Sequence, residues 1–156
     1  MTTIENNMYI FTQERIITKA DYKQNSIVGL TSTNMEYLYY FENANLTLRI
    51  FEYLYGFHQM PVAKVTVIHQ TDGWLVRVKM YSTLNSQQDR DFRAYLNEFG
   101  IPSEASSRLN MVFLSLEAGH SPLDVMRRYQ VVVVSHGSLK QQEIETFRRL
   151  FVSGLG

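Results

Sequence analysis

Two short elements of the chain carry a histidine followed two residues later by a hydroxyl side chain. His69-Gln70-Thr71 ends a run that alternates like a β-strand, and His136-Gly137-Ser138 follows a second, β-branched run. Imidazoles titrate near neutral pH, so a facing pair of them can give and take a proton as acid and base. These four side chains are therefore a candidate catalytic set.

The two H-x-[ST] elements resemble the motif pair of the 2H phosphoesterase superfamily. The resemblance implies that His69 and His136 act as acid and base on a cyclic or similar phosphodiester, while Thr71 and Ser138 bind the phosphate. It covers six residues. The alternative interpretation is that His69 is a hairpin residue with a satisfied ring, and that His136 is a loop residue before a helix capped by Ser138.

Other chemistry finds little support in the residues. The chain has no cysteine, which excludes disulfides, thiolate zinc sites and thiol nucleophiles. None of the four histidines lies at i,i+4 from another, and the common nucleotide, hydrolase and calcium motifs are absent. We expect no metal and no cofactor.

Arginines could instead form a basic face for RNA or DNA. Arg127-Arg128 and Arg148-Arg149 lie near predicted helix C-termini, and Arg90 and Arg93 lie on another predicted helix. Cations are also favoured at helix C-termini by the helix dipole, which is the simpler explanation. The formal net charge is zero, which argues against a protein that mainly binds a phosphate backbone.

Aromatic residues are concentrated in residues 37–57. Tyrosine is enriched at protein interfaces because it combines a large apolar body with a polar tip. Surplus rings here indicate either a core between helix and sheet or a surface for a partner or a second copy. The candidate binding residues are Tyr37, Tyr39, Tyr40, Phe41, Tyr53 and Tyr55.

The element that positions the first histidine is a β-hairpin over residues 62–81. Asp72-Gly73 favours a two-residue type I′ turn, which would place His69 opposite Val76 and Val67 opposite Val78. These residues would share a core face, because side chains alternate along a strand. The opposite face, with Lys64, Thr66, Ile68 and Arg77 among others, is predicted to be mostly solvated.

The rest of the chain contains further predicted strands and helices. Strands are expected over residues 8–18, 26–33, 110–117 and 130–135. A capping box at Thr33 and Glu36 predicts a helix, followed after Asn43-Ala44-Asn45 by a second one that Gly56 ends, although residues 46–50 also alternate like a strand. Further helices are predicted from Ser86 to Phe99, from Ser121 to about Tyr129, and after Ser138.

These elements predict a single α+β domain over residues 1–156. A mixed or antiparallel sheet would carry helices on one face, in a two-layer, ferredoxin-like arrangement of residues 62–152, with residues 1–60 packed on it. We expect a small non-enzymatic binding or regulatory protein that self-associates through its aromatic segment or binds a protein partner. The 2H-type phosphodiesterase and the nucleic-acid-binding protein are the alternatives. With no leader-like N-terminus and no long apolar run, a cytoplasmic protein with no membrane span is expected.

Overall fold

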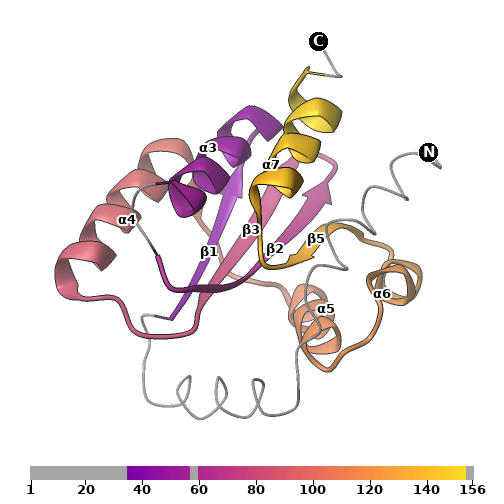
Figure 1. The fold of residues 1–156 in the computed structure, drawn as a ribbon. Coiled ribbons are helices and arrows are strands. Elements are labelled where there is room, and N and C mark those ends of the chain that lie inside the picture. Colours follow the sequence, from indigo (N-terminus) through magenta and orange to yellow (C-terminus); the bar gives the residue numbers. More distant parts are fainter. Residues whose placement is uncertain (1–34, 57–59, 154–156) are drawn as a thin grey trace.

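A computed structural model describes residues 35–56 and 60–153 (Figure 1). The predicted strands over residues 8–18 and 26–33 lie outside the described residues. In chain order, the described elements are β1 (Glu36–Phe41), α3 (Ala44–Tyr55), β2 (Val62–Gln70), β3 (Gly73–Met80), α4 (Ser86–Phe99), β4 (Ile101–Pro102), α5 (Ser107–Glu117), α6 (Pro122–Tyr129), β5 (Val132–Gly137), α7 (Gln141–Phe147) and the π-helical segment η1 (Arg148–Ser153). Within these residues, no helix is long and apolar enough to cross a membrane.

The five described strands form one antiparallel sheet in the order β4-β1-β3-β2-β5. The predicted α+β class is confirmed. The first six elements, β1-α3-β2-β3-α4-β4, follow the βαββαβ pattern of ferredoxin-like domains, with strand order β4-β1-β3-β2. The ferredoxin-like unit therefore begins at β1, earlier than the predicted start at residue 62, and β5 extends the sheet beyond β2.

The shift arises because residues 36–41 are a strand and not the predicted helix. Their side chains alternate between buried and less buried positions, which is the period-two pattern of a strand. The following helix, α3, begins where the break was expected: the Asn43 side chain caps it by accepting a hydrogen bond from the Leu46 N–H at 2.9 Å. Gly56 ends α3, as predicted.

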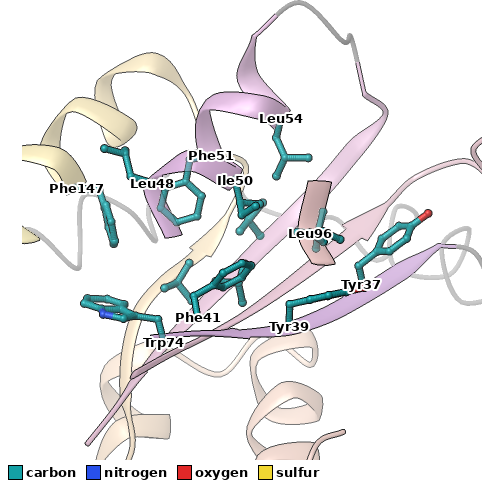
Figure 2. Close-up of a cluster of buried hydrophobic side chains, with 14 of the residues drawn as sticks. Tyr37, Tyr39, Phe41, Leu48, Ile50, Phe51, Leu54, Trp74, Leu96 and Phe147 are labelled. Atoms are coloured by element: carbon teal, nitrogen blue, oxygen red, sulfur yellow. The ribbon is translucent and has the colours of Figure 1, made fainter. Parts of the chain in front are cut away.

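One face of the sheet is covered by α3, α4 and α7 (Figure 1). Large rings fill this layer: Phe51 packs edge-on against Phe147 with centroids 4.9 Å apart, and Trp74 packs against Phe147 at 5.3 Å. Figure 2 shows these rings between the helices and the sheet, with Phe41 on β1 beneath them. This is the main hydrophobic core.

The opposite face of the sheet is covered by α5 and α6, so the described residues form three layers (Figure 1). The prediction of helices on one face is wrong for this part of the chain, as is the prediction of a solvated face, because Ile68 and Leu75 are fully buried beneath these helices. The physical reason is α5, which was predicted as a strand. Its buried residues, Leu109, Val112, Phe113 and Leu116, have the i, i+3, i+4, i+7 spacing of a helical stripe, and the Ser106 side chain caps the helix.

The β2–β3 hairpin forms, but its register differs from the predicted one by two residues. Gln70 pairs with Gly73 and His69 with Trp74, so the connecting residues are Thr71 and Asp72. Neither has a positive φ, which rules out the type I′ turn. Gly73 is needed for another reason: a Cβ there would lie 2.6 Å from the carbonyl oxygen of Phe41 and would clash with the ring of Tyr40. Because the shift is even, the predicted division of the faces is preserved.

The N-terminal cap is as predicted in one helix and differs from the prediction in two others. The Ser121 side chain caps α6 as expected, by accepting from the Asp124 N–H at 3.1 Å. The cap of α4 is Asn85 and not Ser86. Helix α7 begins after Lys140, whose N–H donates to the Glu143 carboxylate at 3.0 Å, and not at Ser138. Residues 138–140 are a short connection after β5.

Candidate functional site

The two histidines of the candidate catalytic set lie on opposite faces of the sheet. His69 is paired with Trp74, and the two rings are in contact with centroids 4.4 Å apart on the α3–α7 side. His136 lies within β5, opposite Thr66, and its Nδ1 is 2.8 Å from the Thr66 hydroxyl. Thr66 alternates with Val65 and Val67 of the main core, so His136 is on the α5–α6 side.

The hydroxyl groups of that set are not gathered either. Thr71 is exposed in the hairpin loop, and Ser138 follows the end of β5. The structure therefore does not bring the imidazoles and hydroxyls into one cleft. Among the residues that the structure describes, no group of three or more His, Asp or Glu side chains could hold a metal ion.

Most of the candidate aromatic residues are part of the core. Tyr37, Tyr39 and Phe41 are 2%, 4% and 0% exposed. The Tyr37 hydroxyl donates to Asp89 at 2.6 Å and the Tyr39 hydroxyl to Asn97 at 2.8 Å. Burial and the hydrogen bond to Asp89 raise the pKa of Tyr37, which stays a neutral donor. These tyrosines tie β1 to α4.

The other three candidate aromatics lie nearer the surface. Tyr40 is half-buried and donates to the backbone carbonyl of Asp72. Tyr53 is half-buried, with its ring centroid 4.4 Å from that of Tyr95. Tyr55 is 50% exposed at the end of α3. The described aromatic segment thus offers one large exposed ring.

The candidate arginines are divided between the two sides of the sheet. Arg90 and Arg93 lie on α4, and Arg127 and Arg128 lie on α6, which covers the opposite face. Arg93 pairs with Asp89 at 3.1 Å, and Arg148 pairs with Glu52 at 3.0 Å. They do not form one continuous basic face.

The sheet face under α5 carries a buried charged network, here called the Arg77 network: Glu36, Lys64, Arg77, Lys79, Glu117 and His136. Arg77 donates to Glu36 at 2.5 Å and to Glu117 at 2.7 Å, and its guanidinium lies 4.8 Å from the Phe113 ring centroid. Lys79 donates to the same oxygen of Glu117 at 2.9 Å. Each ion in this network has a partner of opposite charge or lies beside one, which a buried charge requires.

The network shifts the ionisation of two of its members. Burial alone would raise the pKa of Glu117, but the charges of Arg77 and Lys79 outweigh it and hold the pKa below its usual value. Burial, together with the nearby charge of Lys64, lowers the pKa of His136 to about 3. The imidazole is therefore neutral at physiological pH, as a hydrogen-bonding partner of Thr66 and not as a cation.

Helix α5 has apolar side chains on two sides, one toward the sheet and one away from it. Four of them face the sheet, and two more, Met111 and Leu114, are 49% and 57% exposed on the outer side. The two lie one helical turn apart, so they form one outer stripe. The sequence prediction missed this helix because it was taken for a strand, although the spacing of Leu109, Val112, Phe113 and Leu116 was a readable helical signal.

Comparisons with models of known protein families, with curated proteins and with solved structures found no match.

Proposed function

We propose that this chain is a small non-enzymatic binding protein that acts through protein–protein contacts, with a second copy of itself as the partner. The observation that carries the proposal is the outer stripe of α5, Met111 and Leu114. Met111 and Leu114 form an exposed apolar stripe on the side of α5 that faces away from the sheet, and exposed apolar surface is a feature of protein interaction sites. The sheet accounts for one side of α5, and a partner would account for the other.

A second copy fits this stripe because a two-fold axis brings the same patch of both subunits together. Met111 and Leu114 of one α5 would then pack against the same residues of the other, as in the isologous interfaces of most homodimers. Ile101, which is 61% exposed, pairs with Tyr40 and so projects on the α5 side of the sheet. It would add apolar area to that interface.

The proposed function is the one expected from the sequence, but the proposed interface is on α5 and not in residues 37–57. Self-association was expected through residues 37–57, but Tyr37, Tyr39, Phe41 and Phe51 are already occupied in the core. The 2H-type alternative would need His69 and His136 in one cleft. The nucleic-acid alternative would need the arginines of α4 and α6 on one face. Neither arrangement is present among the described residues, so we propose neither alternative.

The test is the mass of the protein in solution, measured by light scattering over a range of concentrations. We expect a dimer for the full chain and a monomer for the Met111→Glu/Leu114→Glu variant, because each charge would be buried in the interface. Asn110→Glu is the control, since it adds one such charge to an exposed polar position of the same helix. Circular dichroism of each variant establishes that α5 remains folded. A strict monomer at all concentrations, or dimers unaffected by the double substitution, contradicts the proposal.

A further inference from the structure

A second feature of the α5–α6 layer is a cleft of about 380 Å³ between the two helices. That volume is within the range of sites for small molecules. Seven residues line it: Ser115, His120, Asp124, Val125, Arg127, Arg128 and Tyr129. Six of the seven are polar or ionisable, so the cleft has several hydrogen-bonding groups in its lining.

The donors in the cleft come from both helices. The hydroxyls of Ser115 on α5 and Tyr129 on α6 are 3.1 Å apart and hydrogen-bonded. Arg127 and Arg128 form the basic last turn of α6. The helix dipole explains why arginines are tolerated there, but it does not explain why hydroxyl groups and a histidine line the same hollow.

The electrostatics of the cleft favour negative charge. The lining residues include two arginines and one carboxylate, that of Asp124, so positive charge is in excess. The hydrogen bond with Ser115 and the adjacent Arg128 lower the pKa of Tyr129, which is the direction expected where a negative oxygen is stabilised. The same donors and charge would stabilise an oxyanion brought by a ligand.

We propose that this cleft binds the phosphoryl group of a small molecule. Guanidinium groups bind phosphate and carboxylate oxygens through paired N–H donors. A carboxylate has only two oxygens, whereas two arginines, an imidazole and the one hydroxyl proton not used between Ser115 and Tyr129 offer donors for the three peripheral oxygens of a phosphoryl group. Asp124 opposes binding and limits the affinity.

The experiment is a calorimetric titration of the full chain with inorganic phosphate, with phenyl phosphate and with acetate. Saturable binding of both phosphates, with acetate weaker, is expected. Arg127→Gln/Arg128→Gln should weaken phosphate binding by about a hundredfold, since each lost charge-assisted bond is worth about tenfold. Arg90→Gln, on the far side of the sheet, is the matched control and should leave binding unchanged.

Asp124→Asn gives the sharpest test, because it should strengthen phosphate binding, an effect that loss of structure could not produce. Each single arginine variant is measured as well, so the test holds even if the double variant is unfolded. Absence of saturable phosphate binding overturns the proposal. The proposal is also overturned if Arg90→Gln reduces phosphate binding as much as the α6 variants do, or if Asp124→Asn leaves it unchanged. In either case the phosphate would be bound elsewhere on the protein.

Discussion

Arg77 and Glu117 join the outer helical layer to the sheet by a buried ion pair. The Nη2 of Arg77 lies 2.7 Å from Oε1 of Glu117, and the two side chains are 8% and 9% exposed. Arg77 lies in the centre of β3, and Glu117 is the last residue of α5. The pair therefore connects the end of α5 to the middle of the sheet, at the border between the apolar part of that layer and the Arg77 network.

Replacing Glu117 by Gln is predicted to lower the free energy of unfolding by about 3 kcal/mol, because Arg77 and Lys79 would lose the buried counter-charge that they share, and Arg77 would keep only the half-exposed Glu36. Urea unfolding followed by circular dichroism measures the loss. Glu36→Gln is the control: Glu36 also binds Arg77, but its side chain is 49% exposed, so the loss should stay below about 1 kcal/mol. Equal losses of unfolding free energy in the two variants would show that the buried pair with Glu117 stabilises the protein no more than the exposed pair with Glu36.

His136 should make the protein less stable in acid. Its pKa in the folded protein is about 3, against an ordinary value of 6.5 for the unfolded chain. Between these two pH values the unfolded chain binds a proton that the folded protein does not. The free energy of unfolding therefore falls as the pH is lowered from 6.5, by up to about 1.4 kcal/mol per pH unit, and is independent of this group above 6.5.

The measurement is urea unfolding at several pH values between 7 and 5, for the wild type and for His136→Gln. The variant should lose most of the slope, because glutamine does not titrate. His69→Gln serves as the comparison. Partial burial also lowers the pKa of His69, but much of this residue is exposed, so its contribution to the pH dependence of stability should be smaller. Glu117, whose pKa is lowered, adds its own loss of stability only below its ordinary value of 4.5, outside this range. An unchanged slope in His136→Gln would refute the assignment.

Gly73→Ala is predicted to destabilise the protein by about 1–3 kcal/mol through overpacking. The added methyl group would meet the Tyr40 ring and the Phe41 carbonyl, where β1 passes β3 closely. Asp72→Ala, at the exposed neighbouring position, should change stability by less than about 0.5 kcal/mol. If the two substitutions cost the same, then close approach of β1 is not why glycine is present.

Ile68→Ala and Val67→Ala test the three-layer arrangement, since these neighbours point to opposite faces of β2. Val67 is 0% exposed and Ile68 is 1% exposed. Each truncation should cost about 1–4 kcal/mol, because each leaves a cavity in a packed layer. On a sheet covered on one face alone, the Ile68 substitution would be nearly neutral. Thermal and urea unfolding of the two variants distinguish the cases.

Local signals in the sequence determined several elements of this protein. Alternating runs placed β2 and β3, and a continuous β-branched run placed most of β5. The caps and glycines around α3, α4 and α6 located those helices to within a residue or two. Such features depend on neighbours along the chain, since a cap or a turn is satisfied within a few residues. The α+β class followed from their order.

The tertiary structure alone decided the layers and the placing of the candidate sites. Residues 36–41 are a short apolar run that both a strand and a helix could use, and the sheet that pairs with them selects the strand. The hairpin pattern predicts that Ile68 and Arg77 lie on a solvated face. They are buried instead, because α5, which is distant in the sequence, covers that face. His69 and His136, alike in their motifs, lie on opposite faces because His136 pairs with Thr66, which is three residues from His69 on β2. This pairing joins strands that are distant in the sequence, so the motifs alone do not determine it.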